Sequence, residues 1–191
     1  VLETVGYGGG REPIKSIVRE EDGTLWVGTR GNGLFQRKNG TWKRFGRGSG
    51  LVSEIIRTLY IDPAGRLWVG SDGGGLSLRL EDRFVSATTR EGMPNESVSQ
   101  ILMGDACRLW AGTHRGLAVL DEQALDLIAA GKLEDLHPLL INEADGIPAG
   151  EFTIVPPLKT SVGSYAFATV NGFIRLRPED FHPGNTRPEV F

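Results

Sequence analysis

Residues able to carry out chemistry are sparse in this chain of 191 residues. Its three histidines, His114, His137 and His182, do not show the spacing of a metal site. Cys107 is the single cysteine, so no internal disulfide can form, and no base stands near it in sequence to activate it as a nucleophile. We therefore expect no catalytic residue, no metal site and no cofactor.

Three aspartates, Asp22, Asp62 and Asp105, each stand a few residues before a tryptophan, at what reads as one recurring turn position. An aspartate that recurs at a turn usually accepts hydrogen bonds from its own backbone. Catalytic carboxylates would more often stand singly and out of pattern. We interpret all three as turn residues.

Three of the four tryptophans mark an internal repeat. They recur every 42 residues in short strand-like segments, at Trp26, Trp68 and Trp110. A weaker fourth copy covers residues 165–173, with Ala166 at the Trp position and Ala168 at the position of the following Gly. A period of about 40–45 residues with four short strands per unit is typical of a β-propeller. The sequence therefore predicts an all-β fold of propeller blades.

The repeat sets the expected domain organisation. Residues 14–177 are predicted to form four antiparallel four-stranded blades, over 14–45, 54–87, 97–140 and 151–177. Residues 1–13 resemble the remnant of a preceding blade. The Pro-rich residues 178–191 read as an exit linker towards a downstream domain, although 189–191 could also begin another strand.

The third unit contains an insertion, because the Gly residues that precede successive units lie further apart here than before. Within it, Leu125, Ile128 and Ala129 lie at helical spacing, and Asp121 could cap the start. The pattern predicts a helix over residues 121–130, outside the blade sheets, packed as a decoration on the blade edge. A helix that binds a partner is the alternative.

Composition and charge exclude several classes of protein. The formal net charge is −3, so the chain lacks the basic footprint of a nucleic-acid-binding protein. No apolar run approaches the roughly 20 residues of a membrane-spanning helix.

In a propeller, the loops between second and third strands share one rim with the connections between blades. Loops held on a rigid scaffold often carry specificity. Residues in these loops that depart from the repeat are therefore the ligand-binding candidates, namely Arg30, Asn32, Asp72, His114, Arg115 and Asn171. The alternative is that they are solvated turn residues.

The repeat resembles that of a known family. The pattern Asp-x-x-Gly-x-Leu-Trp-Val-Gly-Thr, a short loop, Gly-Leu and a Gly-Leu-Pro connector is similar to the two-component regulator propeller repeat. The matching segments are 22–34, 62–76 and 109–117, and residues 145–178 look like the divergent last blade of such a series. The resemblance implies that these four blades belong to a larger, seven-bladed propeller.

The resemblance implies that the chain is a bacterial, non-enzymatic fragment that senses a ligand. In that family such propellers form the extracytoplasmic region of membrane histidine kinases, hybrid two-component proteins or diguanylate cyclases. This places the chain in the periplasmic or extracytoplasmic part of an inner-membrane protein, with a histidine kinase or a diguanylate cyclase downstream.

The expected partners follow from the same resemblance. They are a small molecule, with a carbohydrate as one candidate, and either the remaining blades or a second copy of the chain, but no nucleic acid. Two alternatives remain open: a propeller-type carbohydrate-active enzyme, which would need paired carboxylates or a polar cluster on the rim, and a protein-interaction scaffold.

Overall fold

Four antiparallel sheets of four strands each follow one another along the chain in the computed structural model. The structure describes residues 6–7, 12–133, 136–147, 151–178 and 189–190. The first sheet contains β1 (Ile14–Arg19), β2 (Leu25–Thr29), β3 (Leu34–Lys38) and β4 (Thr41–Phe45). The second contains β5 (Ile56–Ile61), β6 (Leu67–Ser71), β7 (Leu76–Leu80) and β8 (Arg83–Ala87).

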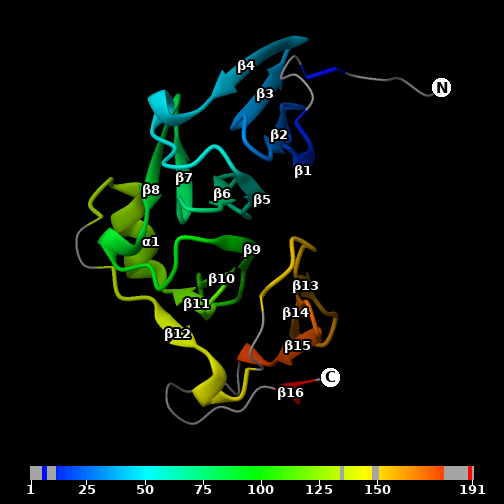
Figure 1. Ribbon diagram of the computed structural model, residues 1–191, viewed down its shortest axis with the longest axis vertical. Coiled ribbons are helices and arrows are strands. Elements are labelled where there is room, and N and C mark those ends of the chain that lie inside the picture. The colour runs from blue at the N-terminus through cyan, green and yellow to red at the C-terminus, as the bar shows by residue number, and fades with distance from the viewer. Residues whose placement is uncertain (1–5, 8–11, 134–135, 148–150, 179–188, 191) are drawn as a thin grey trace, which may run out of the picture.

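The third sheet contains β9 (Val98–Met103), β10 (Leu109–Thr113), β11 (Gly116–Leu120) and β12 (Leu139–Ile141), and the fourth contains β13 (Leu158–Lys159), β14 (Tyr165–Thr169), β15 (Gly172–Leu176) and β16 (Glu189–Val190). In each sheet the strands pair in chain order. The four sheets are arranged as an arc, with β1, β5, β9 and β13 on its inner side (Figure 1). This confirms the predicted propeller blades. No helix in the described part of the chain is long and apolar enough to cross a membrane.

The repeated tryptophan has the same place in three blades. Trp26 lies on the second strand, paired with Val18 and Gln36 on either side. The pairings of Trp68 with Tyr60 and Leu78, and of Trp110 with Leu102 and Val119, repeat this arrangement. All three tryptophans are fully buried, which confirms the equivalent positions that the spacing predicts.

The glycine two residues after each tryptophan is where the next blade packs. A Cβ atom on Gly28 would lie 2.5 Å from Cγ2 of Ile56, well inside van der Waals contact, so only glycine fits. Two further pairs repeat this relation, Gly70 with Val98 and Gly112 with Phe152. We call each glycine a socket and the apolar side chain of the following blade a knob.

The acidic residues before the tryptophans do not share one position, so the predicted recurrence of Asp22, Asp62 and Asp105 at one turn position is wrong. Trp26 donates from Nε1 to Oε1 of Glu20 over 2.7 Å, and Trp68 donates to Oδ2 of Asp62 over 2.9 Å. Glu20 and Asp62 each stand six residues before their tryptophan, whereas Asp22 stands four before. The offset arises because the turns before the tryptophans differ in sequence.

The turn role predicted for these aspartates holds for two of them. Oδ1 of Asp22 accepts from the backbone of Thr24, and Oδ1 of Asp62 accepts from that of Ala64. Asp105 instead accepts from Lys159 Nζ over 2.6 Å and from the Tyr165 hydroxyl over 3.1 Å. It therefore ties the third blade to the fourth.

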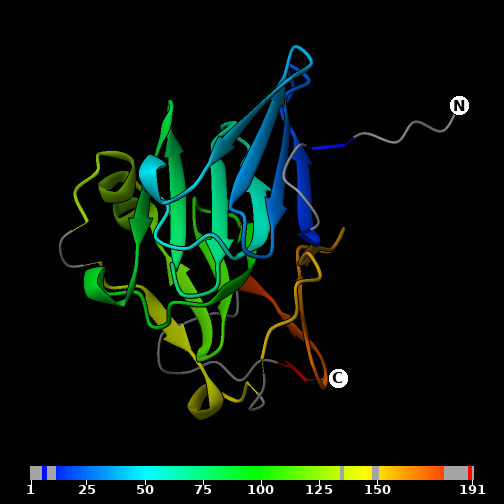
Figure 2. The same cartoon turned by 45° about the horizontal axis from the view of Figure 1, so that its top comes forward.

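The insertion forms helix α1 (Glu122–Ala129), as predicted, and Asp121 caps it by accepting from the backbone of Ala124 over 2.9 Å. The helix replaces the tight turn that joins the third and fourth strands of the first two blades. It lies beside β8 in both views (Figures 1 and 2). Its buried residues Leu125 and Ile128 belong to the same apolar core as Trp68, so it is more than an edge decoration.

The fourth blade extends beyond its predicted end at residue 177. Its outer strand is β16, which pairs with β15 through Ile174 with Val190 and Arg175 with Glu189. Glu189–Val190 therefore form a strand, the alternative that the sequence left open for the end of the exit linker, but this strand completes the fourth sheet. A two-residue strand after a Pro-rich segment carries too little pattern to be assigned to this sheet from sequence.

The predicted blade remnant at residues 1–13 falls largely outside the described residues, which omit 1–5 and 8–11. Within it, the ring of Tyr7 packs edge-on against Phe35 of β3, with 5.1 Å between ring centroids. Tyr7 thus contacts the first blade.

Candidate functional site

A bulge near the start of the inner strand leaves one extra residue in each of the first three blades. In β5 the pairing with β6 shifts between Ile56 and Thr58, which leaves Arg57 as the extra residue. Shifts at the corresponding places of β1 and β9 make Lys15 and Ser99 the extra residues. Bulges of this kind are over-represented next to functional sites because they redirect a side chain.

The guanidinium of Arg57 forms an ion pair with a loop residue of its own blade. Its Nη2 lies 2.9 Å from Oδ2 of Asp72, in the loop between β6 and β7. The backbone of Asp72 is held on both sides, because its N–H donates to the Ile55 carbonyl and its carbonyl accepts from the Ser53 hydroxyl. The carboxylate therefore has a defined place on the rim.

The surroundings of Asp72 favour its charged form. Partial burial raises the pKa of the carboxyl, but hydrogen bonds from Arg57 and Ser97 and the nearby positive charge outweigh it. The pKa of Asp72 consequently lies below its ordinary value. Near neutral pH this position offers a carboxylate that only accepts hydrogen bonds.

Polar contacts continue from the second blade to the fourth. The hydroxyl of Ser97, just before β9, lies 3.1 Å from Nε2 of His114 in the loop between β10 and β11. The same nitrogen lies 3.8 Å from Oε2 of Glu151, which precedes the fourth sheet. We call the five residues Arg57, Asp72, Ser97, His114 and Glu151 the rim cluster.

The rim cluster does not have the geometry of a hydrolytic triad. In such a triad the serine and the acid contact opposite nitrogens of the imidazole ring, so that the acid orients the base. Here Ser97 and Glu151 both approach Nε2 of His114. The arrangement is suited to holding a polar ligand, not to activating the serine.

The structure brings together two of the six residues predicted as ligand candidates, Asp72 and His114, which share one position in successive blades. Arg30 holds that position in the first blade but is exposed and forms an isolated bridge with Ile55. The others lie elsewhere in the loops: Asn32 donates its backbone N–H to Thr29, Arg115 reaches the Pro94 carbonyl at 3.5 Å, and Asn171 is exposed.

Three members of the rim cluster were missed from sequence. Arg57 is the one charged residue in the mostly apolar run 55–61. This contrast could have marked it as a candidate site residue from sequence. Ser97 and Glu151 occupy connections between blades, where nothing in their local sequence distinguishes them from turn residues. Their role arises from the stacking of blades.

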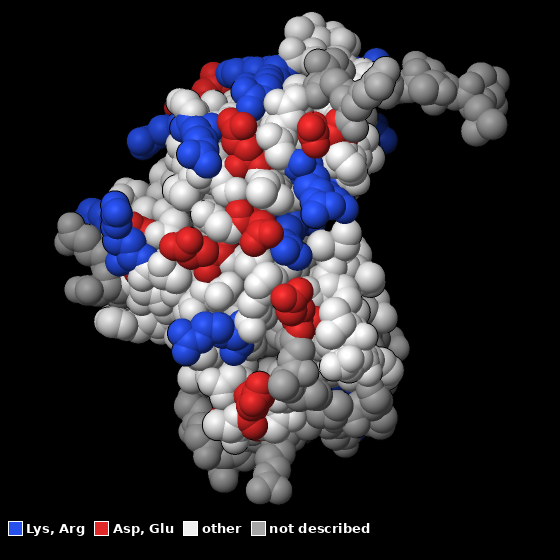
Figure 3. All heavy atoms as spheres, in the orientation of Figure 1, with Lys and Arg blue, Asp and Glu red and all other residues white. Residues whose placement is uncertain are grey.

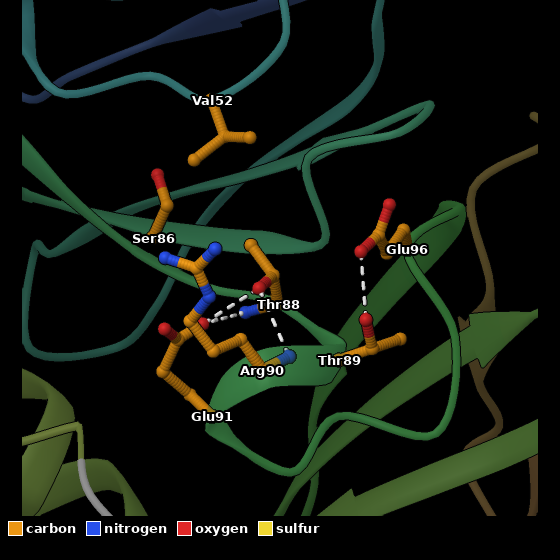
Figure 4. A pocket seen from close by; sticks show the side chains of 7 residues that line it. All are labelled: Val52, Ser86, Thr88, Thr89, Arg90, Glu91 and Glu96. Atoms are coloured by element: carbon orange, nitrogen blue, oxygen red, sulfur yellow. Dashed lines mark hydrogen bonds between the residues drawn. The ribbon is translucent and has the colours of Figure 1, made fainter.

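A separate hollow of about 470 Å³ lies beside the connection between the second and third blades (Figure 4). Its lining includes the 3-10 turn Thr89–Glu91, in which Glu91 accepts from the backbone and hydroxyl of Thr88. Thr89 donates to Glu96 over 2.7 Å, and the Arg90 side chain extends towards Ser86. These bonds stabilise the connector itself, so we assign the candidate site to the rim cluster.

Other reactive groups show no assembled site among the described residues. No group of three or more His, Cys, Asp or Glu side chains there could hold a metal ion. Cys107 is exposed in a turn, and His137 is exposed. His182 lies outside the described residues. Charges of both signs alternate over the face shown in Figure 3.

The stacked sheets define the class of protein as a β-propeller. A family model described as the two-component regulator propeller matches residues 50–73, which include the Trp68 strand. The chain thus carries the repeat of the two-component regulator propeller family, as its motifs predicted.

Solved structures share the fold at low sequence identity. One is described as the extracellular domain of the hybrid two-component system BT3049 from B. thetaiotaomicron, with 22% identity, a TM-score of 0.73, and coverage of 87% of this chain and 22% of that chain. Another, the extracellular domain of the one-component system BT4673 from the same organism, has 20% identity, a TM-score of 0.73 and coverage of 90% and 25%. This chain therefore spans about a quarter of either domain.

An enzyme also shares the fold. Virginiamycin B lyase from Staphylococcus aureus has 15% identity and a TM-score of 0.64, over 90% of this chain and 55% of the lyase. At these identities the likeness shows the fold alone. No curated protein matches the chain significantly.

Proposed function

We propose that this chain is a ligand-sensing part of the extracytoplasmic propeller of a membrane two-component sensor, which signals to a downstream histidine kinase or diguanylate cyclase. The observation that carries the proposal is the family match at residues 50–73, within a repeat that continues through the chain. The extracellular domains of B. thetaiotaomicron support it through the same fold.

The rim cluster is the proposed ligand site. It offers a guanidinium donor, two carboxylate acceptors, a hydroxyl and an imidazole in one connected series. Hydroxyl groups of a small carbohydrate both donate and accept hydrogen bonds, so such a ligand matches the mixture. A ligand with a strong negative charge would meet repulsion from Asp72 and Glu151.

Exposed aliphatic residues are linked through their backbones to the polar groups. Ile55 and Val170 are both exposed. Ile55 is fixed to the site because its carbonyl accepts from Asp72, and Val170 because its N–H donates to the Glu151 carbonyl. They would contact the C–H faces of a bound sugar while the rim cluster bonds its hydroxyls.

The position of the rim cluster also provides a way for ligand binding to change how the blades stack. Its members belong to the second blade, the third blade and the entrance of the fourth. A ligand that bridges them favours one stacking of the three blades over others, and a differential affinity of this kind is what shifts a conformational equilibrium. We propose a binding role without turnover, because the histidine lacks the contacts of an activated base.

A thermal-shift screen of the purified chain against neutral mono- and disaccharides, with inorganic phosphate as a charged comparison, tests the proposal. We expect at least one saccharide to raise the melting temperature, and Asp72→Asn to abolish the increase. Asp126→Asn, on the exposed face of α1, serves as the matched control and should retain it. A shift that survives in Asp72→Asn, or turnover of a saccharide, would contradict the proposed site or role.

A further inference from the structure

The inner strand of the fourth blade is interrupted, whereas the inner strands of the other blades are continuous. In the third blade, β9 pairs with β10 along its whole length apart from one bulge. In the fourth blade, β13 covers only two residues of β14, and the chain pairs with the end of β14 a second time through Phe152 and Thr169. Residues 154–157, between these two pairings, lie outside the strands. Part of the inner edge of β14 therefore has no strand beside it.

A glutamine of the third blade reaches into this break. Gln100 on β9 is fully buried, and its Nε2 donates to the carbonyl of Val155 over 2.8 Å and to that of Ala168 over 2.9 Å. Both acceptors are carbonyls, so the side-chain amide must present its NH₂ group to them. The Ala168 carbonyl also accepts from the backbone N–H of Thr153, over 3.0 Å. One side chain of the third blade thus ties the interrupted segment to β14.

The same position holds shorter side chains in the first two blades. They are Ser16 and Thr58, which pair with the socket glycine of their blades as Gln100 does. Ser16 accepts from the backbone N–H of Leu59 on the next inner strand, over 3.1 Å. The two-residue strand β13 begins too late in the fourth blade to offer such an N–H. A longer side chain that donates hydrogen bonds stands there instead of a hydroxyl.

Gln100 belongs to the same strand pair as two members of the rim cluster. Ser97 immediately precedes β9, and His114 directly follows β10. Glu151 comes instead with the fourth blade, because its carbonyl accepts from the Val170 N–H over 3.1 Å. Its Oε2 lies 3.8 Å from Nε2 of His114. The distance between these two side chains therefore depends on how the entrance of the fourth blade is held against β9.

We propose that Gln100 is a positioning residue of the rim cluster, which holds Glu151 at its place beside His114. The inference rests on the proposed function, because it concerns the assembly of the proposed ligand site. Phe152, the residue after Glu151, fills the Gly112 socket and sets how closely the two blades approach. Apolar packing is non-directional, whereas hydrogen bonds are directional, so the amide of Gln100 supplies the orientation that this packing leaves free.

Amide hydrogen exchange tests whether Gln100 holds the entrance of the fourth blade. Gln100→Met keeps the length and approximate volume of the side chain but removes its donors. We expect the N–H groups of Thr153 and Val170 to exchange about tenfold or more faster in this variant, because two hydrogen bonds that resist local opening are lost. Thr58→Val, at the same position of the second blade, is the matched control and should leave both rates unchanged.

The imidazole NMR shifts of His114 test whether the effect reaches the rim cluster. Near neutral pH, Glu151→Gln should move these resonances in the wild type, because it removes a carboxylate 3.8 Å from Nε2. In Gln100→Met the same substitution should move them roughly half as far or less. A residue with a purely structural role would not change this response. Gln100→Thr, which places the residue type of the second blade at this position, replaces Gln100→Met if that variant does not melt cooperatively.

The saccharide screen separates this inference from the proposed function. Gln100→Met should reduce a melting-temperature increase caused by a neutral mono- or disaccharide, as Asp72→Asn should. An increase that Gln100→Met retains in full would overturn the positioning role. If no saccharide raises the melting temperature of the wild type, the proposed ligand site is wrong, while hydrogen exchange and the His114 shifts still decide whether Gln100 positions Glu151.

Three further outcomes overturn the inference. Unchanged exchange at Thr153 and Val170 in Gln100→Met would show that the amide does not hold this segment. Exchange that rises equally throughout the third and fourth blades would make Gln100 a residue of the general core. An equal response of His114 to Glu151→Gln in both backgrounds would show that Glu151 keeps its place without Gln100.

Discussion

Asp62 accepts a hydrogen bond of 2.9 Å from the indole Nε1 of Trp68, and both side chains are buried. The same carboxylate accepts from the backbone of Ala64 and Arg66, and from Arg66 Nε over 2.6 Å. One side chain thus fixes the turn between β5 and β6 and orients the tryptophan that the neighbouring strands enclose.

We expect Asp62→Ala to lower the free energy of unfolding by about 2–4 kcal/mol, because it leaves several buried donors without an acceptor. Chemical denaturation measures the change. Asp22→Ala is the matched control, since Asp22 bonds only the exposed turn and Lys38, and it should cost less than about 1 kcal/mol. Equal losses in both variants would contradict a special role for Asp62.

The stability should also depend on pH through this group. Burial raises the pKa of Asp62, but bonds from Trp68 and Arg66 outweigh it and hold the pKa below its ordinary value of 3.8. A carboxyl whose pKa is lower in the folded state stabilises the protein above the unfolded pKa, and this contribution is lost as pH falls through the folded one. Denaturation midpoints measured from pH 7 downwards should therefore fall less below about pH 4 in Asp62→Asn than in the wild type. Parallel pH profiles would refute this assignment.

The knob-and-socket packing should appear as an energetic coupling. Gly28→Ala introduces a clash with Ile56 and should cost about 1–3 kcal/mol, and Ile56→Ala should cost about 2–5 kcal/mol. In the double variant the clash is relieved, so the combined loss should be smaller than the sum. Gly48→Ala, where an added Cβ meets nothing within 4 Å, is the control. Strict additivity of Gly28→Ala and Ile56→Ala would mean that the two residues do not pack as described.

Helix α1 should contribute to the stability of the blades. Ile128 is fully buried in the core that includes Trp68, so Ile128→Ala should cost about 2–5 kcal/mol. Gln123→Ala on the exposed face should change little. If a single unfolding transition were unchanged by Ile128→Ala, the helix would be the edge decoration that the sequence first indicated.

The spacing of Trp26, Trp68 and Trp110 was enough to predict the blades, because each tryptophan needs the same enclosed place in a repeated sheet. It was not enough for β16, whose two residues carry no periodic pattern, or for the acids that bond the tryptophans. Asp72 and His114 were predicted as site residues because they depart from the repeat. Arg57, Ser97 and Glu151 were not, because only the bulge in β5 and the stacking of three blades bring them to the same place.

The proposed binding of a small polar ligand by the rim cluster is tested most directly by amide NMR spectra of the ¹⁵N-labelled chain. Neutral mono- and disaccharides would be added to about 10 mM, which detects millimolar dissociation constants. We expect the largest shifts at the amides of Asp72, Ser97 and His114, none at Asp126 on α1, and none in Asp72→Asn. Shifts that are absent, or that lie on α1 or at the connector hollow instead of the rim cluster, would contradict the proposed site.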